Sequence, residues 1–279
     1  MIIIADSGST KTSWCLAGEN DSTKYISTSG INPFFRTSED IETELREKLI
    51  PQIHSDVHRI YFYGAGVINE EKGNIVKLAL KKLFSNAKIE VSSDLLAAVH
   101  ATLGTQKGIV CILGTGSNSC LYDGENIIEH VPPLGFILGD EGSGAVIGRK
   151  IVGDYLKGMM PKTVADKFKI QFPLNYPDFM EGVYKKEKPN QFLARFIPFI
   201  SENIHEEYCK KLIEDSFEEF IKRNLLQYSN FREQPICFVG SLAFYFQDEL
   251  KNVLERNQLQ IKIVLKEPLN GLLKFYTEK

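Results

Sequence analysis

The sequence predicts an α/β fold built from two related lobes. Short apolar or β-branched runs recur along the chain, and segments with helical periodicity lie between them. Each half begins with two such runs, joined by a turn rich in glycine, serine and threonine. Because the two halves share this order but little sequence, the predicted duplication rests on the order of the elements.

Eight short runs are predicted to be strands. Several are uninterrupted apolar runs, which is typical of strands that are buried on both faces of a sheet. The predicted strands cover residues 2–5, 12–17, 59–63, 88–91, 109–113, 118–122, 236–239 and 260–265.

Helices are predicted between these strands. The apolar stripes that indicate the first two helices are Ile41, Leu45 and Leu49, then Ile75, Leu78, Ala79 and Leu83. A third helix is expected to begin near Asp94. The second half contains a helical region over about 142–228, a helix over 241–256 and a last helix from about 268. Breaks in the helical region are expected at Pro161, Pro173, Pro177 and Pro198.

The boundary between the lobes is predicted near 104–108, where the segment LGTQKG interrupts the pattern. The N-terminal lobe would cover residues 1–105 and the C-terminal lobe residues 106–266. A chain of 279 residues is long enough for each lobe to bury a core of its own.

The composition narrows the class of protein. A net charge of -3 gives no basic surplus, so nucleic acid is not expected as a partner. The five cysteines are odd in number and scattered, which is typical of reduced thiols in a cytosol. The apolar start is too short for a signal peptide, and no run is long enough to cross a bilayer. We therefore expect a cytoplasmic protein without a membrane partner.

The first turn, DSGSTKT at residues 6–12, directly follows an apolar strand. Its glycine allows a ligand to approach the backbone closely, and its hydroxyl groups and lysine suit a phosphate. It is not a P-loop, because it lacks the required spacing and a strand follows it. The alternative is an ordinary polar hairpin. The candidate ligands are Asp6 for Mg2+ held through water, and Gly8, Ser9, Thr10, Lys11 and Thr12 for phosphate.

The second turn has the same character and opens the second half of the chain. Two such turns, each opening one half of a duplicated chain, could face each other across a cleft and hold one polyphosphate. Its candidate residues are Gly114, Thr115, Gly116, Ser117 and Asn118.

Asp94 follows a predicted strand in the segment SSDLLAA. Serine and aspartate are common N-caps, so helix capping is one interpretation of this segment. A carboxylate at the carboxyl end of a strand also lies where ligands bind in α/β sheets. There Asp94 could accept the proton of an attacking hydroxyl during phosphoryl transfer.

Two further segments favour ligand binding. In GDEGSG, Asp140 and Glu141 could accept hydrogen bonds from sugar hydroxyls, and the glycine-rich start of the next helix suits an anion. In FVGSLA, Gly240 and Ser241 lie at a strand–turn–helix junction where a flat base could pack on the backbone.

Taken together, DSGSTKT, SSDLLAA, LGTGSNS, GDEGS and FVGSLA resemble the sugar kinase, Hsp70 and actin ATPase superfamily. Within it, the chain resembles the N-acetylglucosamine kinase-like group, which also contains the BadF/BadG/BcrA/BcrD ATPases. This resemblance implies two duplicated ribonuclease H-like (actin/hexokinase-type) lobes with an interlobe cleft. It also implies an ATP- and Mg2+-dependent kinase of an amino sugar, with N-acetylglucosamine and its 6-hydroxyl as the leading expectation.

The resemblance assigns roles to individual residues. It implies that Asp6, Gly8 and Thr10 form the first phosphate hairpin and that Asp94 is the catalytic base. It further implies phosphate and sugar contacts from Thr115, Gly116, Ser117 and Asn118, sugar contacts from Asn32 and Asp140, and an adenosine motif at Gly240 and Ser241. The last helix, about 267–279, should return to the N-terminal lobe. The chain departs from many relatives in reading DSG for DGG and in having Ser241 in place of a second glycine.

Several alternatives stay open at this point. N-acetylmuramic acid, glucosamine and glucose are other acceptors, and Arg36, Lys11 or Arg149 could supply charge for a lactyl carboxylate. An ATPase that activates a 2-hydroxyacyl-CoA dehydratase would need cluster-binding cysteines, and Cys111 and Cys120 flank the second turn. A non-catalytic sugar sensor usually carries a DNA-binding segment before this fold, whereas this chain begins with its first strand. Homodimers are common among such kinases.

Overall fold

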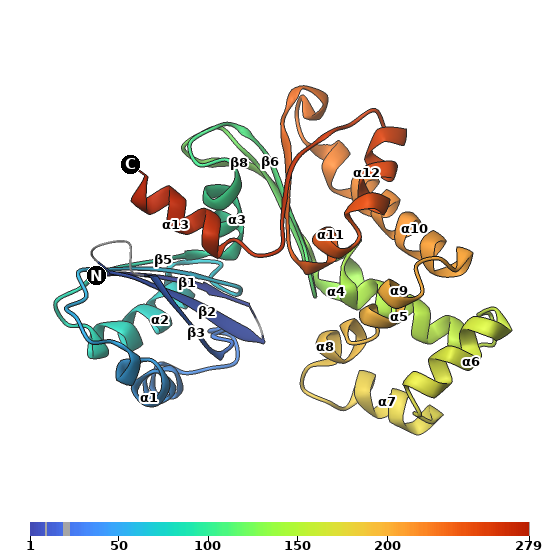
Figure 1. Cartoon of the computed structure of the whole chain (residues 1–279), viewed down its shortest axis with the longest axis horizontal. Helices are drawn as coiled ribbons and strands as arrows, with labels where there is room; N and C mark the ends of the chain where they lie inside the picture. The colour runs from blue at the N-terminus through green and yellow to red at the C-terminus, as the bar shows by residue number, and fades with distance from the viewer. Residues whose placement is uncertain (9, 19–22, 279) are drawn as a thin grey trace. The chain divides into compact units, whose positions relative to one another are not determined.

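The computed structural model describes residues 1–8, 10–18 and 23–278. Two compact units are present, Met1–Gly104 together with Pro268–Lys279, and Thr105–Glu267. Each unit is built around a five-stranded sheet with helices packed against it (Figure 1). No helix in the described part of the chain combines the length and apolar character that crossing a membrane requires.

The sheet of the first unit has the order β3-β2-β1-β4-β5. Strand β2 pairs antiparallel with β1 and β3, whereas β1, β4 and β5 run parallel. The strands are β1 (Ile2–Ser7), β2 (Lys11–Ala17), β3 (Thr23–Ser29), β4 (Arg59–Gly64) and β5 (Lys88–Ser93).

The sheet of the second unit has the order β10-β9-β6-β7-β8, which is the same topology. Strands β6 and β7 form the antiparallel hairpin, and β9 and β10 add parallel strands beside β6. The predicted α/β fold of two duplicated lobes is therefore confirmed. The strands are β6 (Gly108–Leu113), β7 (Ser117–Tyr122), β8 (Ile127–Val131), β9 (Ile236–Val239) and β10 (Ile261–Leu265).

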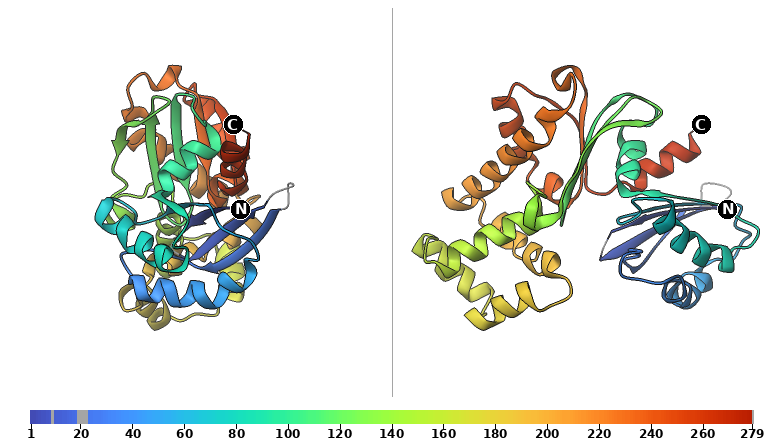
Figure 2. Two further views of the ribbon diagram at one scale, coloured as in Figure 1. Left: turned by 90° about the vertical axis from the view of Figure 1, so that its left-hand side faces the viewer. Right: turned by 180° about the vertical axis from the view of Figure 1, so that it is seen from behind.

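Helices cover both faces of the first sheet (Figures 1 and 2). Because side chains alternate along a strand, Ile3 packs into the core under α1 (Ser38–Lys48) and α2 (Glu70–Leu83). Its neighbour Ile4 packs on the other face with α3 (Asp94–Thr102) and the terminal helix α13 (Leu269–Thr277). The last helix thus belongs to the first unit, and its backbone lies against that of α3 at Gly271.

The core of the second unit lies between its sheet and a set of helices rich in phenylalanine. Phe168, Phe196 and Phe199 are fully buried there, and the ring of Phe168 contacts the rings of the other two. The helices are α4 (Gly135–Leu138), α5 (Gly144–Leu156), α6 (Lys162–Gln171), α7 (Tyr176–Tyr184), α8 (Pro189–Ala194), α9 (Ile197–Glu202), α10 (Glu207–Arg223), α11 (Ser241–Tyr245) and α12 (Gln247–Arg256). Short 3-10 turns lie at Ile50–Gln52, Leu225–Gln227 and Phe231–Glu233.

Some expectations about single elements were wrong. Strands β3 and β8 were not predicted. Leu78, assigned to the buried stripe of α2, is exposed, because Val76, Ala79 and Leu80 form that face. The expected breaks near Pro177 and Pro198 do occur, but both prolines lie just after them, in the first turns of α7 and α9, where a missing N–H has no helical partner to lose. The helix predicted over 241–256 is two helices, separated at Phe246.

Candidate active site

The first turn joins β1 to β2 and is closed by a hydrogen bond from the Gly8 N–H to the Lys11 carbonyl oxygen at 3.0 Å. Thr10 and Lys11 are exposed at this turn. The Thr10 carbonyl oxygen accepts a hydrogen bond from the Gly30 N–H at 3.0 Å, which ties the turn to the segment after β3. Ser9, a predicted phosphate contact, lies outside the described residues.

Asp6 and Asp94 lie at one edge of the first sheet. Asp6 on β1 and Ser92 on β5 are both in register with Tyr63 on the intervening strand β4, and Asp94 follows two residues after Ser92. Because the three strands run parallel, their carboxyl ends meet at the same edge. Two strand spacings correspond to roughly 10 Å between β1 and β5. The predicted metal ligand and the predicted base therefore lie on neighbouring parts of one surface.

Ser93, not Asp94, is the N-cap of α3. The Ser93 hydroxyl accepts a hydrogen bond from the Leu96 N–H at 3.2 Å. Asp94 is the first residue of the helix, and its carboxylate accepts from the Leu95 N–H at 2.9 Å. Burial raises the pKa of Asp94, and the N–H groups that contact it oppose this rise. The capping hydroxyl of α3 therefore comes from Ser93, while the Asp94 carboxylate accepts from the next N–H and burial favours its protonated form.

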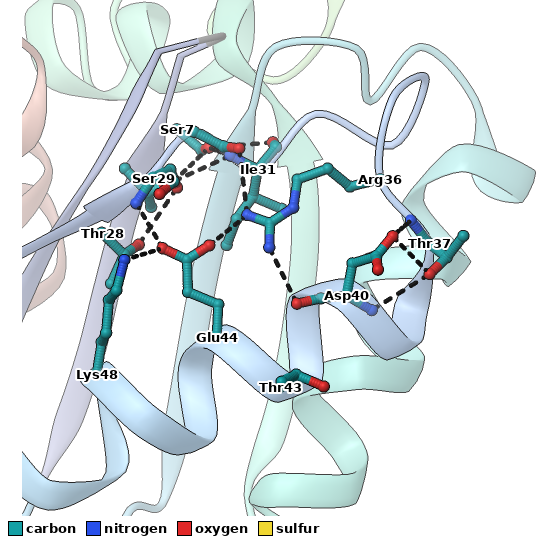
Figure 3. Close-up of polar contacts among 12 residues, drawn as sticks. Ser7, Thr28, Ser29, Ile31, Arg36, Thr37, Asp40, Thr43, Glu44 and Lys48 are labelled. Carbon is teal, nitrogen blue, oxygen red and sulfur yellow. Dashed lines mark hydrogen bonds and ion pairs between the residues drawn. The ribbon is translucent and has the colours of Figure 1, made fainter.

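The segment that carries Asn32 is fixed by two buried hydroxyls from the first hairpin (Figure 3). The Ser7 hydroxyl accepts from the Ile31 N–H at 2.9 Å and lies 2.7 Å from the hydroxyl of Thr12. The Thr12 hydroxyl in turn donates to the Ser29 carbonyl oxygen at 3.0 Å. Thr12 was expected to contact phosphate, but the structure buries its side chain and directs it toward this segment. Ser7 was missed, because nothing in the local pattern separates it from an ordinary strand-end serine.

An ion-pair cluster anchors the same segment from α1 (Figure 3). The Glu44 carboxylate accepts from the Ser29 N–H at 2.8 Å and pairs with Arg36 at 2.6 Å and with Lys48 at 3.0 Å. Although partial burial raises the pKa of Glu44, these contacts outweigh it and lower the pKa to about 2. The Arg36 guanidinium also donates to the Asp40 carbonyl oxygen at 3.0 Å. Arg36 is therefore engaged in holding the loop.

The amide of Asn32 is held in one orientation. Its Oδ1 accepts from the Phe34 N–H at 2.9 Å. Gly66, which has φ of +85°, lies against the same atom, because a Cβ at this position would come within 2.3 Å of Oδ1. Among the residues that the structure describes, none accepts a hydrogen bond from Asn32 Nδ2, so this donor is available to a ligand.

The second turn is held by the start of α5. The Gly144 N–H donates to the Gly114 carbonyl oxygen at 2.8 Å, and the Ala145 N–H donates to that of Thr115 at 3.0 Å. The next amide, of Val146, donates to the capping hydroxyl of Ser143. The expectation that this helix start receives an anion is therefore wrong, because protein oxygens already accept from its first amides.

Asp140 lies beside the second turn and has a left-handed backbone with φ of +54°. Its Oδ1 accepts from the Ser117 N–H at 3.4 Å. Burial raises the pKa of Asp140 to about 6, helped by the charge of Glu141 and opposed by the Ser117 N–H. A carboxylate in this position can accept hydrogen bonds from a ligand while it is ionised.

Glu141 points into the protein, in contrast to its expected role as a sugar contact. Its carboxylate pairs with Arg223 Nε at 2.7 Å, and its other oxygen accepts from Asn224 Nδ2 at 3.3 Å. Both partners lie at the end of α10, about 80 residues away along the chain. Glu141 thus fastens the loop that carries Asp140 to the helical core.

With the sugar contact that the resemblance implies for Asp140, its raised pKa predicts a pH dependence of sugar binding. Below about pH 6 the carboxylate is protonated and the ionised acceptor is lost. We expect the KM for sugar to rise about tenfold between pH 7 and pH 5, because ionisation then falls about tenfold. Asp140→Asn should remove this step. A KM for sugar that stays constant over this range in the wild-type protein would contradict the assignment.

Gly240 lies at the carboxyl edge of the second sheet, beside the second turn. Its N–H donates to the Leu265 carbonyl oxygen at 2.9 Å, and its φ is +126°. A Cβ at this position would come within 2.2 Å of the Leu113 carbonyl oxygen, so only glycine fits. Ser241 begins α11 and is exposed. The two predicted adenosine residues therefore lie close to the end of β6, where the second turn begins.

Comparison with known proteins gives three informative structures. No family model and no curated protein matches the chain. A candidate N-acetylglucosamine kinase from Porphyromonas gingivalis is 43% identical, with a TM-score of 0.95, over 100% of this chain and 99% of its own. A second candidate N-acetylglucosamine kinase, from Chromobacterium violaceum, is 16% identical with a TM-score of 0.74, and the alignment covers 98% of each chain. A ROK family glucokinase from Streptomyces griseus, solved with glucose and AMPPNP, is 14% identical with a TM-score of 0.58 over 98% of this chain and 97% of its own.

The two more distant structures share the fold, which defines the class as the actin-like ATPase fold of two α/β lobes. The full-length match at 43% identity is more specific. The chain belongs to the N-acetylglucosamine kinase-like family within the sugar kinase, Hsp70 and actin ATPase superfamily, and it is an ATP-dependent sugar kinase.

Proposed function

We propose that the protein transfers the γ-phosphoryl group of ATP to the 6-hydroxyl of an amino sugar, with N-acetylglucosamine as the first choice. The observation that carries the proposal is the edge of the first sheet. It combines Asp94, whose pKa burial raises and which is not the N-cap of α3, with Asp6 and the fixed amide of Asn32.

In this proposal Asp94 accepts the proton of the sugar hydroxyl as the hydroxyl attacks phosphorus. Asn32 and Asp140 hold the sugar, since the first offers an amide donor and the second a carboxylate acceptor. The backbone of the two turns and the Gly240–Ser241 junction bind the nucleotide. In this proposal, different groups accept the proton, bind the sugar and bind the nucleotide.

Asp6 fits a magnesium site of the kind found in phosphoryl transfer. It is a carboxylate at a strand end beside a phosphate turn, and Mg2+ is usually held by one or two carboxylates together with waters and substrate phosphates. In the described part of the chain, no three side chains of His, Cys, Asp or Glu gather in one place. Bound Mg2+ would neutralise charge on the transferred phosphate.

An uncharged sugar fits better than one with a carboxylate. Of the three basic residues considered for a lactyl group, Arg36 pairs with Glu44 at 2.6 Å. Arg149 donates to the Phe136 carbonyl oxygen at 2.6 Å. Two of the three cations are thus engaged by protein groups on neighbouring helices, α1 for Arg36 and α4 for Arg149, which favours N-acetylglucosamine over N-acetylmuramic acid.

The cysteines favour a kinase over an activator of a 2-hydroxyacyl-CoA dehydratase. Cys111 and Cys120 are fully buried on β6 and β7. Burial raises the pKa of Cys120 to about 12 and that of Cys111 well above its usual value. An iron–sulfur cluster needs thiolates, so these positions oppose cluster binding. The presence of Asp94 likewise favours an enzyme over a sugar sensor without catalysis.

The test measures ADP release from ATP and Mg2+ against N-acetylglucosamine, N-acetylmuramic acid, glucosamine and glucose, with a control that lacks sugar. We expect strong turnover with N-acetylglucosamine and none with its 6-deoxy analogue, which lacks the accepting hydroxyl. ADP release that ignores every sugar would overturn the kinase proposal and favour an activating ATPase. A cytoplasmic location and a homodimer belong to the same proposal, and sedimentation of the pure protein tests the dimer.

A further inference from the structure

His130 on β8 contacts Asn118 on the neighbouring strand β7. The two strands pair antiparallel with His130 opposite Cys120, so His130 and Asn118 are diagonal neighbours on one face of the sheet. His130 Nε2 lies 2.8 Å from Asn118 Oδ1. Sequence reasoning did not connect these residues, because the β8 strand was not predicted.

The contacts of Asn118 determine which atom of its amide group faces outward. The Ser119 N–H lies 2.9 Å from the same side-chain atom that His130 contacts. A backbone N–H can only donate, so this atom must be the amide oxygen and not the nitrogen. An amide oxygen can only accept, so His130 must present a proton on Nε2.

Both contacts therefore engage Oδ1, and Asn118 Nδ2 is left as the outward donor. No residue in ranges 1–8, 10–18 and 23–278 accepts a hydrogen bond from this nitrogen. Asn118 directly follows the second turn and lies one residue from Ser117, whose N–H contacts Asp140. The donor thus belongs to the residue next to the one whose N–H contacts Asp140, the proposed sugar-binding carboxylate.

We infer that His130 is a positioning residue that fixes the Asn118 amide so that Nδ2 donates to an oxygen atom of the sugar. This inference rests on the proposed function. It also defines the chemistry of the recognised atom. A hydroxyl or an acetamide carbonyl oxygen can accept from Nδ2, whereas a protonated amine cannot. Without His130, Oδ1 keeps only the Ser119 N–H contact, so one hydrogen bond instead of two holds the orientation of the amide.

The experiment is a double-mutant cycle with His130→Phe and Asn118→Ala, together with His130→Gln, whose amide can still donate to Asn118. We expect His130→Phe to raise the KM for sugar about 5- to 10-fold, which corresponds to the loss of one hydrogen bond. The kcat and the KM for ATP should change by less than about twofold. His130→Gln should restore the KM for sugar to within about twofold of the wild-type value, and His130→Phe should have no further effect when Asn118 is alanine.

Three results would overturn the inference. The first is an unchanged KM for sugar in His130→Phe. The second is additive effects of His130→Phe and Asn118→Ala on the KM for sugar. The third is an equal rise in the KM for sugar and the KM for ATP. The same cycle can be measured as Kd for sugar by calorimetry without ATP. If the wild-type protein binds a sugar but does not phosphorylate it, the proposed function fails and the Kd cycle still decides the role of His130. If it binds no sugar of the panel, both proposals fail.

Discussion

Replacing Asp94 by asparagine is expected to lower kcat at least ~100-fold while the Kd for sugar changes little. Asparagine keeps the size and polarity of the side chain but cannot accept the proton of the attacking hydroxyl. The helix should remain intact, because Ser93 and not Asp94 caps α3. Steady-state kinetics and calorimetry with the sugar that gives turnover would separate the loss of kcat from binding.

Ser93→Ala is the matched control for this substitution. It removes the capping hydroxyl and should cost about 1 kcal/mol of stability, with Asp94 still present. We expect its kcat to stay within a few-fold of the wild-type value. A near-normal kcat in Asp94→Asn would assign Asp94 to local structure and leave the protein without an identified base.

Gly240→Ala is expected to abolish most ATP binding and to destabilise the second unit by about 3 kcal/mol or more. The backbone at this position has φ of +126°, and a Cβ would lie 2.2 Å from the Leu113 carbonyl oxygen. Leu113 is the last residue before the second turn, so relief of this clash must displace the strand end that leads into that turn. Thermal unfolding and the KM for ATP would measure the two effects.

Gly153→Ala provides the control, because a methyl group added to this glycine of α5 would meet no neighbouring atom within 4 Å. Alanine is the better helix former, so this variant should gain up to about 1 kcal/mol and bind ATP normally. Normal ATP binding and stability in Gly240→Ala would show that the Gly240–Ser241 junction does not carry the nucleotide site.

Most strands could be predicted from the sequence, whereas β3 and β8, each at one edge of its sheet, could not. Runs such as IVCIL in β6 are apolar because both of their faces are covered. In β3, by contrast, Ile26 is half-buried and most of the other residues are exposed, so the pattern resembles a polar loop. Strand β8 is similar, with exposed Ile128 and His130 alternating with half-buried neighbours. Each of these two strands pairs on one side only, with the strand that precedes it in the chain, and the other side has no partner strand in the described sheet.

The candidate site, like the fold, could be predicted from the sequence only in part. Sequence reasoning placed Asp6 and Asp94 each at the end of a strand, because strand ends are local properties, whereas the parallel pairing of both strands with β4 is shown by the structure. It could not foresee that Glu141 pairs with Arg223 or that Thr12 bonds to the Ser29 carbonyl oxygen. These partners are set by tertiary packing, and a side chain in a glycine-rich loop can turn toward ligand or protein with no change in the local pattern.

The hydrogen bonds from the start of α5 to the second turn join the segments proposed to bind phosphate and sugar into one body. Gly144 and Ala145 hold the carbonyl oxygens of Gly114 and Thr115, and Asp140 lies only a few residues before this helix start. A displacement of the second turn must therefore move Asp140, the proposed sugar contact, with it. Binding of one substrate can then order the residues that contact the other substrate, and thermodynamic linkage requires this effect to be reciprocal.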